Sequence, residues 1–220
     1  MKIAKFILGS MQTNCYFIID EITKNCMIVD PADDIDVIMK KLTDKELTCE
    51  GIMLTHGHFD HMLALEALRD RTKAKLYIHE ADNELLLDPE KSLMSFYTGS
   101  KIPCRCADVL LKDGDTIDFH GNIIKVMHTP GHTKGSCCYL IGEHMICGDT
   151  LFRGSIGRYD FYGGDYDTIL SSLEKIKALK TDYRIYPGHG PSSHLSYEKE
   201  YNLYIKKRGL TPSFLSNGYI

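Results

Sequence analysis

Two kinds of hydrophobic pattern alternate along the first half of the chain. Short apolar runs bounded by turn residues predict strands, and they occupy residues 3–8, 15–19, 26–29, 50–54 and 75–78. Apolar residues three or four positions apart predict helices, and they occur over 33–45, from 62 onward and over 80–87. Residues 89–107 show neither pattern and contain two prolines and a glycine, which predicts a long irregular loop.

The second half repeats these patterns. Strands are predicted near 108–111, 115–119, 122–127, 137–141, 144–147 and 183–186, and helices over 166–179 and 198–207. Because the strands come in runs with helices between the runs, two helix-covered sheets fit better than one parallel sheet with strict βαβ alternation. The 220 residues are enough to bury one core, so we expect a single α/β (α+β) domain over 1–220.

The segment after the predicted strand at 50–54 carries four potential metal ligands. Residues 55–61 read Thr-His-Gly-His-Phe-Asp-His. If this segment is extended, His56, His58 and Asp60 share one side, because side chains alternate. The adjacent Asp60 and His61 must then diverge, so one segment can serve two ions. Imidazole and carboxylate together suit zinc, iron or manganese, and so dense a set of ligand types disfavours an ordinary polar surface loop.

Three later loops each place one further candidate ligand beside a glycine at the end of a predicted strand. They are His132 in segment 129–133, Asp149 in segment 148–152 and His189 in segment 187–190. Each alone is a weak signal, since a polar residue beside a glycine turn is common. Together with residues 55–61, and in this order, they predict a metal site built from four loops.

Composition and charge narrow the classes of partner. With 26 basic and 30 acidic side chains and a net charge of -4, nothing favours nucleic acid or an anionic membrane, so we expect a small-molecule partner. The eight cysteines include no C-x-x-C pair and mostly lie in apolar runs, which predicts buried, reduced thiols. The apolar N-terminal run is too short for a signal peptide, and no stretch approaches the ~18 apolar residues of a membrane helix. These features predict a cytoplasmic protein.

The order of these motifs resembles that of the metallo-β-lactamase-fold hydrolases. More narrowly, the chain is similar to the short bacterial proteins related to hydroxyacylglutathione hydrolase (glyoxalase II). The resemblance runs from Gln-Thr-Asn-Cys-Tyr at 12–16 to residue 199, and it includes Val-Asp-Pro at 29–31 and Gly-Arg at 157–158. It implies the metallo-β-lactamase fold, a four-layer αββα sandwich with two metal ions at one edge of the paired sheets.

The resemblance also assigns the ligands. It gives one metal to His56, His58 and His132, the second to Asp60, His61 and His189, and the bridging position to Asp149. Asp30 matches an aspartate that supports the site by accepting a hydrogen bond from a ligating imidazole. The cofactor expected is two divalent ions per chain, zinc first, with iron or manganese as alternatives.

The expected chemistry is hydrolysis by a metal-bound hydroxide, because two nearby ions lower the pKa of water and polarise a carbonyl. Asp60 can orient that hydroxide and receive its proton. A thioester suits such a site, since a thiolate leaves without obligatory protonation. Resemblance to glyoxalase II then names S-lactoylglutathione as a candidate substrate.

The chain departs from full-length glyoxalase II after the last ligand motif. Only 30 of the 220 residues follow Gly190, so we expect no separate C-terminal helical domain that holds glutathione. Arg158 and Tyr97 are candidate substrate contacts. The alternatives are that Arg158 pairs with Asp160 and that the loop carrying Tyr97 packs against the protein. The basic run at 206–208 either binds a carboxylate or pairs with a helix dipole.

Two rival functions remain open on the sequence. A mono-iron persulfide dioxygenase has the same fold and the same Gly-Arg pair, but its last motif usually reads Pro-Ala-His-Asp, whereas residues 187–190 here read Pro-Gly-His-Gly. The second rival is a non-catalytic metal-binding module. Structural zinc sites are usually four-coordinate and rich in thiolates, so seven nitrogen and oxygen ligands favour a catalytic centre.

Overall fold

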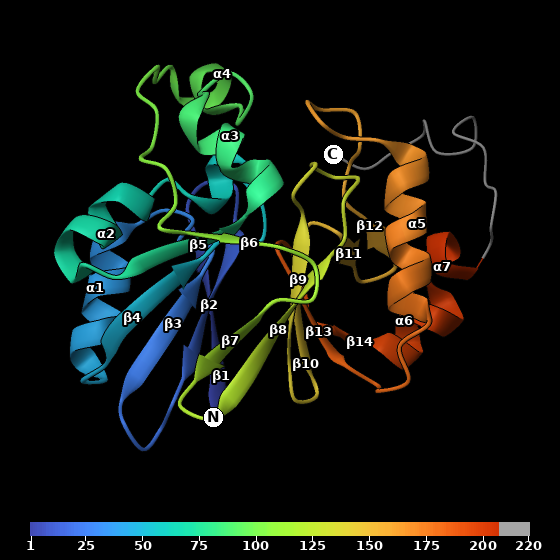
Figure 1. Cartoon of the computed structure of the whole chain (residues 1–220), viewed down its shortest axis with the longest axis horizontal. Helices are drawn as coiled ribbons and strands as arrows, with labels where there is room; N and C mark the ends of the chain where they lie inside the picture. The colour runs from blue at the N-terminus through green and yellow to red at the C-terminus, as the bar shows by residue number, and fades with distance from the viewer. Residues whose placement is uncertain (207–220) are drawn as a thin grey trace.

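Two six-stranded sheets form the centre of the molecule (Figure 1), which is a computed structural model that describes residues 1–206. The first sheet has the order β1-β2-β3-β4-β5-β6. Its strands are β1 (Lys2–Leu8), β2 (Thr13–Ile19), β3 (Asn25–Val29), β4 (Thr48–Met53), β5 (Lys75–His79) and β6 (Val109–Leu111). Strands β1 to β3 are antiparallel, whereas β3 to β6 are parallel. The parallel part therefore sends the ends of β3, β4 and β5 to the same edge.

The second sheet has the order β14-β13-β10-β9-β8-β7. Its strands are β7 (Thr116–Phe119), β8 (Asn122–His128), β9 (Cys137–Ile141), β10 (His144–Gly148), β13 (Arg184–Pro187) and β14 (Ser193–His194). Strands β10 and β13 are parallel, and the other pairs are antiparallel. A small hairpin of β11 (Leu151–Phe152) and β12 (Ser155–Ile156) follows β10.

Helices cover the outer face of each sheet (Figure 1). The first sheet carries α1 (Ile35–Asp44), α2 (Leu65–Thr72), α3 (Asn83–Leu87) and α4 (Met94–Thr98), with 3-10 turns η1 (Phe59–His61) and η2 (Glu80–Asp82). The second sheet carries α5 (Tyr166–Lys177), α6 (Leu195–Tyr201) and α7 (Leu203–Lys206). Helix α5 begins where the Asp165 side chain accepts a hydrogen bond from the Thr168 amide at 2.7 Å.

Strand β2 illustrates why the chain makes four layers. All seven of its residues are buried, so it cannot have a solvent face. Cys15 and Phe17 pack under α1 and α2 in one apolar cluster, while Tyr16 and Ile18 pack between the two sheets in another. A third cluster joins the second sheet to α5 and α6. Because side chains alternate along a strand, this arrangement gives the predicted αββα sandwich.

The structure corrects several predicted elements. The loop over 89–107 contains α4, and the short strands β11, β12 and β14 were not predicted, because two-residue strands leave no periodicity to read. The helix expected over 198–207 is two helices, α6 and α7, separated at Asn202. The Asn202 side chain donates to the Ser155 carbonyl at 3.0 Å and to Glu198 at 2.9 Å, which ties this break to the β12 strand. Lys207 and Arg208 lie outside the described residues.

All eight cysteines are free, and six of them are buried, as predicted; Cys104 is half-buried and Cys106 is exposed. Among the helices in residues 1–206, none is both long and apolar enough to cross a membrane.

Candidate metal centre

The candidate ligands lie on loops that leave the two sheets at one edge of the sandwich. The segment 55–61 follows β4, and Asp30 follows β3. His132, Asp149 and His189 follow β8, β10 and β13 of the second sheet. The two sheets face each other, so residues far apart in the sequence meet there. Three sets of side chains have their potential ligand atoms within 4.8 Å of one another, namely His56–His58–His132, His56–His61–Asp149 and Asp60–His61–His189.

The His132 group, defined as His56, His58 and His132, is a buried cluster of three imidazoles. His132 Nε2 lies 2.9 Å from His58 Nδ1 and 3.1 Å from His56 Nε2. Burial, together with the neighbouring imidazoles, lowers the pKa of His56 well below its ordinary value and that of His58 to about 3. These rings are therefore neutral near pH 7, the form in which imidazole binds a metal.

The His189 group, defined as Asp60, His61 and His189, combines imidazole with carboxylate. His189 Nε2 lies 3.1 Å from Asp60 Oδ2, and His61 Nε2 lies 3.6 Å from the same oxygen. Burial opposes the charged form of His61, but Asp60 and Asp149 outweigh it and raise its pKa. Burial likewise raises the pKa of Asp60, but His61 and His189 outweigh it and lower that pKa. The His189 side chain is 29% exposed, so this group is the more open one.

Asp149 lies between the two groups. Its Oδ1 is 3.5 Å from His61 Nε2, and its Oδ2 is 3.7 Å from His132 Nε2 and 3.6 Å from His189 Nε2. The approach of the β13 loop depends on Gly188, because a Cβ at that position would overlap the Asp149 carboxylate. One carboxylate thus faces both groups, as a bridging ligand must.

Hydrogen bonds on the far side of two rings fix which nitrogen points into the site. His61 Nδ1 donates to Asp30 Oδ2 at 2.9 Å, and His132 Nδ1 donates to the Arg158 carbonyl at 2.6 Å. Asp30 is itself held by the amide and the hydroxyl of Thr55, at 2.8 and 2.7 Å. Both rings therefore present Nε2 to the centre, the nitrogen that can bind a metal once it carries no proton.

Three buried atoms of the centre are left without a hydrogen-bond partner in residues 1–206. They are His58 Nε2, His61 Nε2 and Asp149 Oδ1. Buried polar atoms are rarely unpaired. In His58 and His61 the other ring nitrogen, Nδ1, already has a contact, to His132 and to Asp30 respectively. Nitrogen ligands on one tetrahedral zinc lie roughly 3.3 Å apart, close to the nitrogen separations in the His132 group. The residues therefore fit divalent metal ions.

Asp82, which no motif singles out, holds two ligand loops together. Its fully buried carboxylate accepts hydrogen bonds from the Gly57 amide at 2.9 Å, the Thr133 hydroxyl at 2.7 Å and the Gly135 amide at 2.6 Å. Burial raises the pKa of Asp82, although these donors oppose the shift. Asp82 thereby joins the loop that carries His58 to the loop that carries His132.

Thr13 is a second residue that the sequence did not single out as functional. Its buried hydroxyl donates to Asp60 Oδ2 at 3.1 Å. Thr13 also pairs with His189 in an isolated antiparallel bridge. The start of β2 therefore supports two members of the His189 group.

The two candidate substrate contacts are engaged within the protein. Arg158 makes two hydrogen bonds of 2.8 Å to Asp160, and its guanidinium lies 3.6 Å from the centroid of the Phe161 ring. Tyr97 stacks on Phe59 with centroids 4.5 Å apart, and remains 47% exposed. These contacts match the two alternatives considered from the sequence. A substrate contact by either residue stays a prediction.

Comparison with known proteins agrees with this geometry. The chain matches the family described as the metallo-beta-lactamase superfamily over residues 8–189. It is 32% identical to the probable metallo-hydrolase YqgX of Bacillus subtilis, over 93% of this chain and 98% of YqgX. It is 28% identical to the hydroxyacylglutathione hydrolase GloC of Haemophilus influenzae, over 94% of this chain and 100% of GloC.

Solved structures give the same result. The BLEG-1 B3 metallo-beta-lactamase superposes with a TM-score of 0.88 at 34% identity, over 94% of this chain and 100% of that one. TTHA1623, solved in a di-iron-bound form, superposes with a TM-score of 0.80 at 31% identity, over 91% and 99% of the two chains. The sandwich, the clustered His and Asp side chains and these matches together show that the chain belongs to the metallo-β-lactamase superfamily.

Proposed function

We propose that this protein hydrolyses small thioesters such as S-lactoylglutathione, with two divalent metal ions held by the His132 and His189 groups and bridged by Asp149. The observation that carries the proposal is the cluster of seven nitrogen and oxygen ligands, three of which have a buried side-chain atom without a hydrogen-bond partner in residues 1–206. The similarity to GloC, named as a hydroxyacylglutathione hydrolase, supports the thioester. Zinc is the metal that we propose, and the di-iron form of TTHA1623 keeps iron as the alternative.

Different residues of the chain would bind the ions, orient the water and accept its proton. Two bound divalent ions would supply Lewis acidity and a lowered water pKa. Asp60, whose lowered pKa keeps it ionised near pH 7, would orient the attacking water and accept its proton. Asp30 and the Arg158 carbonyl keep His61 and His132 in one tautomer. The C–S bond then breaks with the electron pair leaving on sulfur, and a thiolate needs no general acid.

The test is a thiol-release assay on purified protein whose metals have been counted. We expect two metals per chain, release of thiol from S-lactoylglutathione, loss of release with a chelator and its return on adding back the metal. Protein with two metals bound that releases no thiol would remove the proposed substrate and leave the metal centre intact.

Three other outcomes would identify different functions. One iron per chain with oxygen consumed on a persulfide would indicate a dioxygenase. Opening of a cephalosporin ring would indicate a β-lactamase, a candidate that the similarity to BLEG-1 favours. Metal-loaded protein inert towards thioesters, lactones, phosphoesters and β-lactams would indicate a metal-binding module. A small-molecule partner is common to all but the last.

A further inference from the structure

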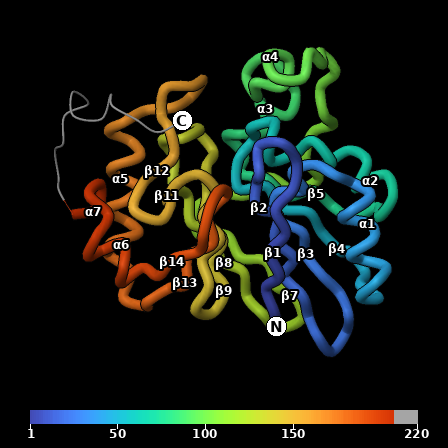
Figure 2. The backbone as a smooth tube through the Cα atoms, turned by 180° about the vertical axis from the view of Figure 1, so that it is seen from behind, coloured from blue at the N-terminus to red at the C-terminus, as the bar shows by residue number. Residues whose placement is uncertain are grey.

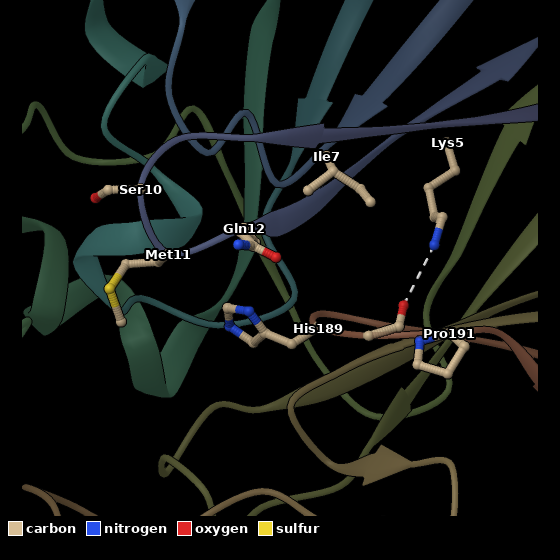
Figure 3. Close-up of a pocket in the computed structure, with 8 residues that line it drawn as sticks. Lys5, Ile7, Ser10, Met11, Gln12, His189 and Pro191 are labelled. Carbon is tan, nitrogen blue, oxygen red and sulfur yellow. Dashed lines mark hydrogen bonds between the residues drawn. The ribbon is translucent and has the colours of Figure 1, made fainter. Parts of the chain in front are cut away.

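A pocket of about 600 Å³ opens directly beside His189. That volume is in the range of small-ligand sites. One wall comes from β1 and the hairpin that follows it, and the other from the loop after β13. Figure 3 shows Lys5 and Ile7 extending from β1 towards the loop that carries His189 and Pro191, with Gln12 and Met11 at the hairpin.

Hydrogen bonds next to this pocket join β2 to the loop after β13. The Asn14 amide donates to the Gly188 carbonyl at 2.7 Å, and the Asn14 side chain donates to Pro187 and Gly190 carbonyls at 2.9 and 3.0 Å. The Tyr16 hydroxyl donates to the Pro187 carbonyl at 2.6 Å. Figure 2 shows the β1–β2 hairpin beside the connection between β13 and β14. These bonds fix the position of the loop that carries His189 and Gly190 relative to the β1–β2 hairpin.

The lining of the pocket combines apolar side chains with the polar side chains of Ser10 and Gln12, and the Lys5 cation lies at one end (Figure 3). Ile7 and Met11 are 58% and 44% exposed, which is high for large apolar side chains that line a pocket. Lys5 Nζ donates to the Gly190 carbonyl at 3.2 Å (Figure 3) and has no carboxylate within salt-bridge distance in the described chain. The Gly190 carbonyl also accepts from Asn14, so it stays paired if Lys5 turns to a ligand.

Arg158 gives a useful contrast with Lys5, because it lies at the other end of the metal centre. Its carbonyl accepts the hydrogen bond from His132, whereas the pocket adjoins His189. The Arg158 guanidinium is already neutralised by two hydrogen bonds to Asp160. Of these two cations beside the centre, only Lys5 is free of an acidic partner.

We infer that this pocket binds the acyl part of the substrate, and that the acyl part has an apolar stem ending in a second carboxylate that accepts a hydrogen bond from Lys5. This inference rests on the proposed thioester hydrolysis. The water oxygen forms a bond to the acyl carbon at the metal centre, the C–S bond breaks, and the electron pair leaves on the thiolate. The products are a dicarboxylate and a thiol, because one proton of the water passes through Asp60 to solvent and the other protonates the thiolate.

The first experiment compares glutaryl and valeryl thioesters of one thiol, which have the same five-carbon acyl chain with and without a terminal carboxylate. A charged hydrogen bond typically changes affinity by about tenfold, so we expect kcat/KM to favour the glutaryl ester by about that factor. Lys5→Met should reduce the preference to less than about twofold. Lys2→Met, on the same strand but outside the pocket, should keep it. No preference, or a preference that survives in Lys5→Met, overturns the inference while the hydrolase stands.

The second experiment separates the pocket from the reaction. Calorimetry of metal-loaded protein with glutarate and with valerate measures the effect of the second carboxylate without turnover. We expect glutarate to bind about tenfold more tightly, and Lys5→Met to weaken glutarate but not valerate. If no thioester is cleaved, the proposed function falls and this difference still decides the pocket. Equal affinities for the two acids would overturn the inference.

Discussion

The two ends of the candidate metal centre are built from different chemistry. The His132 group contains only imidazoles, all three of them buried, with nitrogens 2.9 and 3.1 Å apart. The His189 group mixes imidazole with carboxylate and includes a side chain that is 29% exposed. The first is fixed by Asp82 and a main-chain carbonyl, the second by Thr13 and the β1–β2 hairpin. One end is thus suited to hold an ion, and the other to meet substrate.

The two ends also differ in the protonation state of their histidines. Burial and the neighbouring imidazoles lower the pKa of His56 and His58, so these two rings are unprotonated near pH 7. Carboxylates overcome burial and favour protonated His61 and His189. Since a metal displaces protons from its ligands, an ion should enter the His132 group at lower pH than it enters the His189 group.

The largest effect is expected from His56→Ala. His56 belongs to the His132 group and to the set with His61 and Asp149, so its loss should remove the ion of the His132 group. Activity should fall by more than the ten- to hundredfold that is typical of supporting residues. Metal analysis and the thiol-release assay check this. His120→Ala is the matched control, because His120 contacts Glu50 and Asn25 outside the site. Full activity with two metals retained in His56→Ala would refute the ligand assignment.

Asp82→Ala should weaken the His132 end selectively. It leaves three buried donors unpaired, which should lower the free energy of unfolding by about 3 kcal/mol or more and the affinity for the first ion by about ten- to hundredfold. Urea unfolding and metal titration measure the two quantities. Asp82→Asn, which keeps the shape and one acceptor oxygen, should lie between. An equal loss of affinity for the first and the second ion would show that Asp82 does not support the His132 group selectively.

Thr13→Val tests the other end with a smaller change. It removes one hydrogen bond to Asp60 with little change in volume. We expect a loss of about 1 kcal/mol in stability and about a tenfold decrease in affinity for the second ion only. Thr13→Ser keeps the hydroxyl and should behave as the unchanged protein in the same metal titration. Weaker binding of the first ion by Thr13→Val would contradict the proposal that Thr13 supports only the His189 group.

The smallest effect is a pH dependence behind the His132 end. Burial and the stacked His128, with centroids 3.9 Å apart, lower the pKa of His79 to about 4. His128 Nε2 in turn donates to the Lys134 carbonyl, close to His132. The unfolded chain binds a proton at His79 more readily than the folded chain does. The contribution of neutral His79 to the free energy of unfolding is therefore lost as the pH falls from about 6.5 to about 4.

The measurement is the urea midpoint at pH 7 and at pH 5 in the original protein and in His79→Asn. In the original protein, the Ala81 amide donates a hydrogen bond to His79 Nδ1 at 3.3 Å. Asparagine keeps a side-chain acceptor for this amide. We expect the original protein to lose more stability between the two pH values. An equal loss in both proteins would remove His79 as the titrating group.

Local patterns were sufficient for the long elements and failed for some of the short ones. Strand β2 and helix α5 were predicted, because each is long enough to show alternation or helical spacing. Helix α4 has five residues, and β11, β12 and β14 have two each, too few for a period. The single C-terminal helix was predicted across Asn202, because periodicity carries no sign that a side chain there bonds to another element.

By itself the sequence determined which residue types follow which strands, and in what order. That was enough to predict the His and Asp loops, because a ligand motif is local and a strand end is visible in the hydrophobic pattern. Only the tertiary structure decided that Asp82 joins two ligand loops, that Thr13 supports Asp60, and that Lys5 lies beside Gly190. These pairs are dozens of residues apart or more, and their contact depends on how two whole sheets pack, which no short pattern encodes.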